Sequence, residues 1–120
     1  MKQFENSNLT FCKIRTQQKR PFEPAWNTKG YSWEKLQPWL KLGGNYGVIC
    51  GNGLIVIDAD TPELCTAVES FFPETFTVET GSGGRHYYYY CSFDKKHVLS
   101  KNNIHYGEIQ GTGSQVVGPN

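Results

Sequence analysis

Two acidic residues stand one position apart at the end of an apolar segment, GLIVIDAD (53–60). Side chains alternate between the two faces of a strand, so Asp58 and Asp60 share one face of the strand that this segment predicts. The residues before them are apolar on both faces, which is typical of a strand buried on both sides. Because an unpaired carboxylate is costly to bury, the pair indicates a cation nearby. Mg²⁺ fits well, since proteins bind it through one or two carboxylates together with substrate phosphates.

This acid pair also has a plainer interpretation. A chain with 11 acidic residues contains such pairs by chance, and every short motif carries that false-positive risk. Asp60 would then cap the helix that follows, and Asp58 would be solvated. The position of the pair at the end of a buried strand favours metal binding over this alternative.

A glycine-rich segment, TGSGGRHYYYY (80–90), is the second candidate for chemistry. Glycines let a loop approach a ligand closely, and successive backbone N–H groups can hold phosphate. Arg85 and His86 follow at once and add donors for phosphate oxygens. The alternative is an ordinary hairpin turn with an incidental histidine, and the four tyrosines are more typical of sheet packing than of base stacking.

A third acid, Glu108, lies inside the apolar segment GEIQGTGSQVVG (107–118). Strand alternation places it on one face with Tyr106 and Gln110. A lone acid in a strand is usually an exposed edge residue. Three acids beside an Arg-His pair and a glycine loop are the groups that two-metal phosphoryl or nucleotidyl transfer requires, with the metals about 3.5–4 Å apart.

Composition limits the partners and the compartment. The 120 residues suffice for one domain with a hydrophobic core, and the formal net charge is only +1. Any nucleic-acid contact must therefore come from a local patch. Most basic residues of the first third fall between 13 and 41: Lys13, Arg15, Lys19, Arg20, Lys29, Lys35 and Lys41. No signal peptide or membrane segment is visible, so we expect a cytoplasmic protein.

The four cysteines carry no zinc-binding pattern. They form no CxxC pair and no cluster with histidine, so no zinc site is expected. Three of them lie within apolar segments and are interpreted as small core residues: Cys50, Cys65 and Cys91.

Periodicity and turn residues predict an α+β sandwich in which strands dominate. One helix is expected from the Ser32 cap to Lys41, and a second of about ten residues after the Thr61-Pro62 cap, with Phe71 and Phe72 on its apolar face. The Gly-Asn-Gly turn at 51–53 predicts a hairpin between the strands on either side of it. Further strands are expected at 10–15, 75–80, 85–93, 104–110 and 114–118, the last two as a pair, with a polar linker at 94–103.

Taken in order, the segments NYGVICGNGLIVIDAD, TGSGGRHYYYY and GEIQGTGSQVVGPN resemble the bifunctional primase/polymerase (prim-pol) domain of the archaeo-eukaryotic primase superfamily. The resemblance covers 45–120, and the upstream KRPFEPAWNTKGYS is similar to the usual lead-in of that family. It implies an α+β fold with an RRM-like antiparallel or mixed sheet and packed helices. It also implies that residues 1–120 are the catalytic domain of a larger replication protein, with further domains such as a helicase, of plasmid, viral or archaeal origin.

The resemblance also implies roles for particular residues. Asp58, Asp60 and Glu108 match the catalytic acids that bind two divalent cations, Mg²⁺ or Mn²⁺, although the third acid is usually Asp. His86 matches the histidine that contacts the phosphates of the incoming nucleotide, and Ser82, Gly83 and Arg85 belong to the same nucleotide-binding motif. The implied partners are nucleoside triphosphates and a single-stranded DNA template with its primer.

Two departures from the family pattern stand out. Gln110 occupies a position where many members carry a basic residue, which removes one expected nucleotide contact. The zinc-binding insertion of some members is missing, which bears more on primer initiation than on extension. The ending VVGPN has no closing element, so we expect a C-terminally truncated domain that binds metal and nucleotide but extends primers poorly.

Two other functions fit the same residues. One is a non-catalytic RRM-like nucleic-acid-binding module whose acids are vestigial. The other is a metal-dependent nuclease, because hydrolysis and transfer share the two-metal chemistry.

Overall fold

The chain forms two compact units, which we describe separately. The structure is a computed structural model that describes residues 2–119. One unit runs up to Ile49 and resumes at Gln115, and the other spans Cys50–Ser114. Within the described residues there are two helices and two sheets whose strands pair antiparallel throughout, so the α+β prediction is confirmed. Neither helix has the length and apolar character that crossing a membrane requires.

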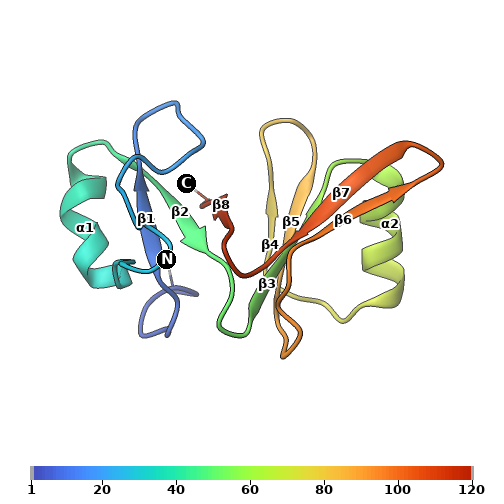
Figure 1. The fold of residues 1–120 in the computed structure, drawn as a ribbon, viewed down its shortest axis with the longest axis horizontal. Coiled ribbons are helices and arrows are strands. Elements are labelled where there is room, and N and C mark those ends of the chain that lie inside the picture. Colours follow the sequence, from blue (N-terminus) through green and yellow to red (C-terminus); the bar gives the residue numbers. More distant parts are fainter. Residues whose placement is uncertain (1, 120) are drawn as a thin grey trace. The chain divides into compact units, whose positions relative to one another are not determined.

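The first unit is a three-stranded sheet with one helix (Figure 1). Ser32 caps the helix by accepting a hydrogen bond from the Lys35 backbone N–H at 3.3 Å. Four aromatic rings with centroids 5.1–6.4 Å apart pack together in its core: Phe4, Phe11, Trp33 and Tyr46. The elements are β1 (Phe11–Ile14), α1 (Trp33–Lys41), β2 (Asn45–Ile49) and β8 (Gln115–Val117), in sheet order β1-β2-β8.

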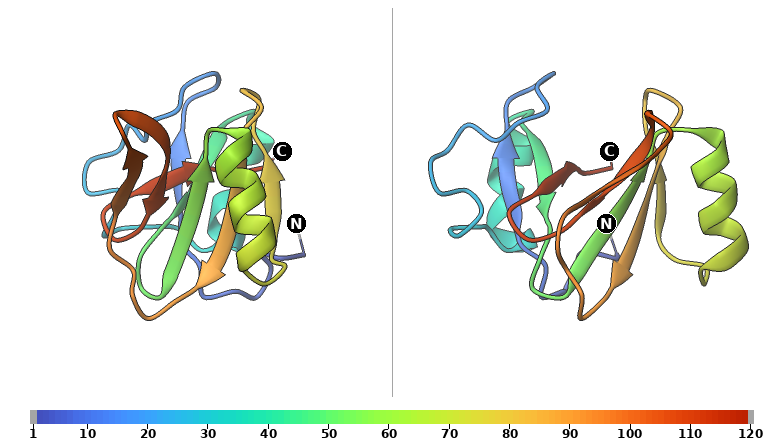
Figure 2. Two further views of the ribbon diagram at one scale, coloured as in Figure 1. Left: turned by 90° about the vertical axis from the view of Figure 1, so that its right-hand side faces the viewer. Right: turned by 45° about the vertical axis from the view of Figure 1, so that its right-hand side comes forward.

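The second unit is a five-stranded sheet with a helix lying along one face (Figures 1 and 2). The most apolar strand, β3, lies at the centre and is buried on both faces, as the sequence predicts. The elements are β3 (Leu54–Ala59), α2 (Pro62–Phe71), β4 (Thr77–Glu79), β5 (Arg85–Tyr90), β6 (His97–Lys101) and β7 (Ile104–Gln110), in sheet order β4-β5-β3-β7-β6.

The core under α2 determines which face of this sheet is left for chemistry. Ile57, Ala59 and Tyr87 pack with Val68 of the helix. These three sheet residues lie on the face opposite to Asp58, because neighbouring strand residues point to opposite faces. Thr61, and not Asp60, caps α2, since its hydroxyl accepts from the Leu64 backbone N–H at 3.2 Å. The capping alternative for Asp60 is therefore wrong.

Both predicted hairpins are wrong as strand pairs, although their turns exist. Gly51 and Gly53 have φ of +102° and +90°, and the turn closes with a single bridge between Gly51 and Leu54. Beyond that bridge β2 and β3 belong to different sheets, and so do β7 and β8. The C-terminal strand pairs with β2 instead, with Val116 opposite Val48.

Three further predictions about local structure are corrected. The segment 94–103 is not a linker, because it contains β6 at the edge of the five-stranded sheet. Phe71 and Phe72 are exposed and not part of the buried core under α2, although the Phe72 ring lies 5.9 Å from that of Tyr89. Cys50 is buried as expected, whereas Cys65 and Cys91 are only partly buried.

Candidate active site

Asp58, His86 and Glu108 form one row across the middle of the five-stranded sheet. Asp58 lies on the central strand, directly opposite His86 of β5 on one side and Glu108 of β7 on the other. Directly opposite residues of antiparallel strands share a face, so the three side chains lie on the face away from α2. We call this the acid face.

His86 is the most enclosed member of the row. Its Nε2 lies 3.3 Å from Oδ1 of Asp58, and its side chain is only 11% exposed. Its Nδ1 is buried and has no hydrogen-bond partner among the described residues. A buried polar atom of this kind calls for an explanation, such as a bound ion or a functional role.

Asp60 joins the row from the end of β3. Its backbone N–H donates to the Tyr106 carbonyl at 2.9 Å, which continues the pairing of β3 with β7. Burial raises the pKa of the Asp60 carboxyl, and the charge of Asp58, a hydrogen bond with Asp58 and the charge of Glu108 raise it further, while His105 lowers it. The negative charges of Asp58 and Glu108 therefore both disfavour ionisation of the Asp60 carboxyl.

This coupling predicts the effect of Asp58→Asn on its neighbour. Removing the Asp58 charge should lower the pKa of Asp60, while the contribution from burial remains and keeps that pKa above its ordinary value. Carboxyl ¹³C chemical shifts followed through a pH titration, without added metal, would report the pKa of Asp60 in the parent and in the variant. An unchanged Asp60 titration in Asp58→Asn would show that the two carboxyl groups do not interact.

A fifth side chain, His105, reaches the acid face although strand alternation places it on the other one. On β6, Leu99 faces Gly107 and the next residue, Ser100, faces His105, so β7 carries one extra residue, Tyr106, at a β-bulge. Bulges turn side chains in this way and are frequent beside active sites. His105 Nδ1 lies 3.7 Å from Oδ2 of Asp60, and its Nε2 lies 3.9 Å from Oε1 of Glu108.

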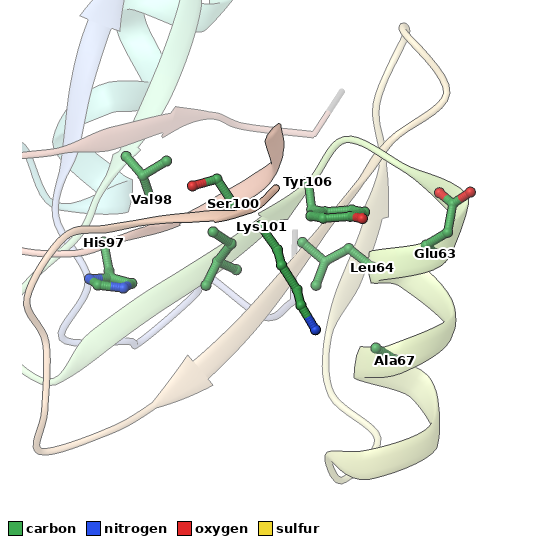
Figure 3. A pocket seen from close by; sticks show the side chains of 9 residues that line it. Glu63, Leu64, Ala67, His97, Val98, Ser100, Lys101 and Tyr106 are labelled. Carbon is green, nitrogen blue, oxygen red and sulfur yellow. The ribbon is translucent and has the colours of Figure 1, made fainter. Parts of the chain in front are cut away.

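The same bulge corrects the predicted orientation of Tyr106. The tyrosine does not share a face with Glu108 but lines a groove of about 420 Å³ together with Leu64 and Ala67 of α2. Figure 3 shows its ring beside Leu64, on the helix side of the sheet. Sequence periodicity could not reveal His105 as a member of the site, because nothing in the local pattern marks the bulge.

The glycine loop leads into β5 and thereby positions His86 in the row. The side chain of its neighbour Arg85 points to the opposite face of the strand. Thr80 and Gly84 close the loop, with the Gly84 N–H donating to Oγ1 of Thr80 at 3.0 Å. Ser82 and Gly83 lie in its exposed turn, and Gly83 has a φ of +90°. A Cβ on Gly84 would stand 2.5 Å from the Ala59 carbonyl oxygen, so only glycine allows the loop this close to β3.

Arg85 points to the helix side of the sheet. Its Nη1 lies 2.7 Å from Oε2 of Glu69 on α2, and its Nη2 lies 3.7 Å from Oε1 of Glu79. The Tyr87 hydroxyl donates to the same Glu69 oxygen at 2.6 Å. Of the residues that the sequence associates with nucleotide binding, the structure thus brings His86 to the acids and places the Arg85 side chain away from them.

The donors on the acid face fit a hard divalent cation by their chemistry. Among residues 2–119, no group of three His, Cys, Asp or Glu side chains is arranged to hold a metal ion as it stands. Carboxylate oxygens are nevertheless the ligands that Mg²⁺ and Mn²⁺ take. Burial is the main cause of the raised pKa of Asp60, and a cation between these acids would relieve the charge repulsion that adds to it.

An antiparallel sheet that gathers acids and a histidine beside a glycine loop suits proteins that act on nucleotides, and comparison with known proteins identifies the family. The family model of the bifunctional DNA primase/polymerase N-terminal domain (Prim-Pol) matches residues 3–120. The chain belongs to this family, which confirms the resemblance seen in the sequence. None of the curated proteins matches the chain. Family membership implies nucleotides and DNA as partners.

Proposed function

We propose that this chain is the catalytic domain of a DNA primase/polymerase, which adds nucleotides to a primer in a template-directed reaction during DNA replication. Two observations support the proposal: membership of the Prim-Pol family, and the alignment of Asp58, His86 and Glu108 in one row with Asp60 beside them. The alignment supports the proposed chemistry, because it places carboxylates and a hydrogen-bond donor for phosphate on one face of one sheet.

In this proposal Asp58, Asp60 and Glu108 hold two divalent cations. When bound, such cations supply the activation of the attacking hydroxyl and the stabilisation of charge on the attacking and leaving oxygens. The protein holds the carboxylates that bind these cations in fixed positions. Asp58 and Glu108 are fixed on paired strands of a packed sheet, and sites built on such elements hold their geometry better than sites on loops.

His86 has a different role from the three acids: it donates a hydrogen bond to the phosphates of the nucleotide. Asp58 lies against its Nε2 and orients the ring. When both ring nitrogens are protonated each is a donor, and Nδ1, which has no partner among the described residues, is the one that we assign to phosphate. The backbone N–H groups of the Ser82–Gly83 turn are the further donors that we assign to phosphate. Arg85 stabilises the sheet and α2 through Glu69.

A pair of variants tests this division of roles. His86→Ala should weaken binding of a nucleoside triphosphate about tenfold, because it removes a hydrogen bond to a charged group. Arg85→Met should change that affinity less than about threefold, because its guanidinium contacts Glu69 on the other face. Fluorescence anisotropy with a labelled, non-hydrolysable triphosphate measures both. An equal loss in the two variants would mean that Arg85 leaves Glu69 to bind phosphate, and no loss in either would refute nucleotide binding at this loop.

The reaction itself is tested on a primed single-stranded DNA template with labelled deoxynucleotides or ribonucleotides and either Mg²⁺ or Mn²⁺. Longer primers support the proposal, shortened primers would indicate a nuclease, and retention of DNA without turnover would indicate a binding module. Low ionic strength suits this assay, because a chain of net charge +1 neutralises few phosphates and binds DNA weakly as salt rises.

A further inference from the structure

His105 has a geometry that its exposed position alone does not explain. Its two ring nitrogens each face a different carboxylate, Nδ1 toward Asp60 at 3.7 Å and Nε2 toward Glu108 at 3.9 Å. His97, another exposed histidine of the same sheet, forms no ion pair with any carboxylate of the described residues. His105 reaches the acid face only because β7 carries the bulge at Tyr106. We propose that His105 is a nitrogen ligand of the cation bound by Asp58 and Asp60.

The distances support direct ligation. Donor atoms that share one cation at about 2.1 Å lie roughly 3–3.5 Å apart, whether the geometry is octahedral or tetrahedral. The 3.7 Å between His105 Nδ1 and Asp60 Oδ2 exceeds that spacing by only a few tenths of an ångström. Both side chains are partly solvent-exposed, 49% and 43%, so small rotations can close the difference without disturbing the core.

The second nitrogen faces the kind of group that a metal-bound histidine usually has as its partner. Histidines that bind a metal through one ring nitrogen donate the other N–H to a carboxylate, a carbonyl or water, which fixes the ring. Oε1 of Glu108 lies 3.9 Å from Nε2 of His105, beyond hydrogen-bonding distance, so a small rotation of these side chains is needed to form that bond. One oxygen of Glu108 can orient the imidazole while the other remains available to a cation.

The donor set then determines which cation is preferred. Mg²⁺ takes oxygen ligands and gives up water reluctantly, whereas transition metals accept imidazole nitrogen. A site of two carboxylates and one imidazole therefore favours Mn²⁺ over Mg²⁺ more than the three acids alone would. This inference rests on the proposed function, because it assigns an added ligand and a metal preference to the same site.

The test uses Mn²⁺ alone as the probe, with no nucleotide or DNA. Binding is measured from the electron paramagnetic resonance signal of free Mn²⁺, and Mg²⁺ affinity from its competition with Mn²⁺. His105→Ala should weaken Mn²⁺ binding about tenfold or more and Mg²⁺ binding less than about threefold. Electron spin-echo modulation from a coordinated ¹⁴N should be present in the parent and in His97→Ala, and absent in His105→Ala.

The controls separate this inference from the function on which it rests. If Asp60→Asn loses Mn²⁺ binding while His105→Ala retains both the affinity and the ¹⁴N modulation, His105 is no ligand and the proposed metal site stands. If neither variant changes Mn²⁺ binding, the acids do not form the site, and the proposed function and this inference fail together. Modulation that survives in His105→Ala but disappears in His86→Ala would assign the nitrogen ligand to His86 and overturn the inference.

Discussion

Asp58→Asn is expected to reduce nucleotide incorporation on a primed template by a factor on the order of 10²–10³, as is typical when a group that stabilises transition-state charge is removed. Asp58 is central to the site: it lies against His86, pairs with Glu108 across the sheet and raises the pKa of Asp60. The substitution keeps the size of the side chain and removes its charge. Incorporation of labelled nucleotide per unit time, at saturating Mg²⁺ or Mn²⁺, measures the effect.

A matched control separates the effect of removing the Asp58 charge at this site from the effect of removing any acidic charge. Glu63→Gln also converts an acid of the second unit to its amide, but Glu63 lies on α2 and lines the groove on the other side of the sheet. Its incorporation rate should stay within about twofold of the parent, because surface substitutions away from a site have small effects. If both variants lost activity alike, a general effect of net charge would explain the loss, and the assignment of Asp58 would fail.

The second large effect is expected from Gly107→Ala. A Cβ at Gly107 would lie 2.1 Å from the Asp58 carbonyl oxygen and 2.8 Å from Cδ2 of Leu64. The carbonyl belongs to the central strand and cannot move aside, so β7 must shift away from β3. Such overpacking costs about 1–3 kcal/mol, and the shift would also displace Glu108 from the row. Urea unfolding followed by circular dichroism should show the loss of stability, and the incorporation assay should show lost activity.

Gly81→Ala is the control for this prediction. Gly81 has open space where its Cβ would lie, and its φ is outside the left-handed region. We expect a change in unfolding free energy within about 0.5 kcal/mol. Stability alone is compared, because Gly81 belongs to the loop that we assign to phosphate. A Gly107→Ala protein as stable as Gly81→Ala would mean that the close contact of β7 with β3 at Asp58 is not present in solution.

Local sequence features were sufficient for the central strand and its acids. The apolar residues of 54–57 predict a strand buried on both faces, and Asp58 emerges from it as expected. The helix caps at Ser32 and Thr61 also follow from residue type alone, because each hydroxyl satisfies a backbone N–H within one turn.

Features that depend on pairing between distant strands could not be predicted in this way. The Gly-Asn-Gly turn indicates a reversal of the chain, but the sheet that each flanking strand joins depends on partners far away in the sequence. Strand β6 is mostly exposed on both faces, so it lacks the alternation that marks a strand. The bulge at Tyr106 changes which face each side chain occupies, and this change brings His105 to the site while no local pattern records it.

In the proposed nucleotidyl transfer site, Asp58, Asp60 and Glu108 bind the divalent cations. An anomalous difference map from a crystal of the protein with Mn²⁺ and a non-hydrolysable nucleoside triphosphate tests it most directly. We expect a Mn²⁺ peak within about 2.5 Å of carboxylate oxygens of Asp58 and Asp60, with Glu108 beside it and the triphosphate near His86. Mn²⁺ bound to the triphosphate away from these acids, or anomalous peaks only elsewhere on the chain, would contradict it.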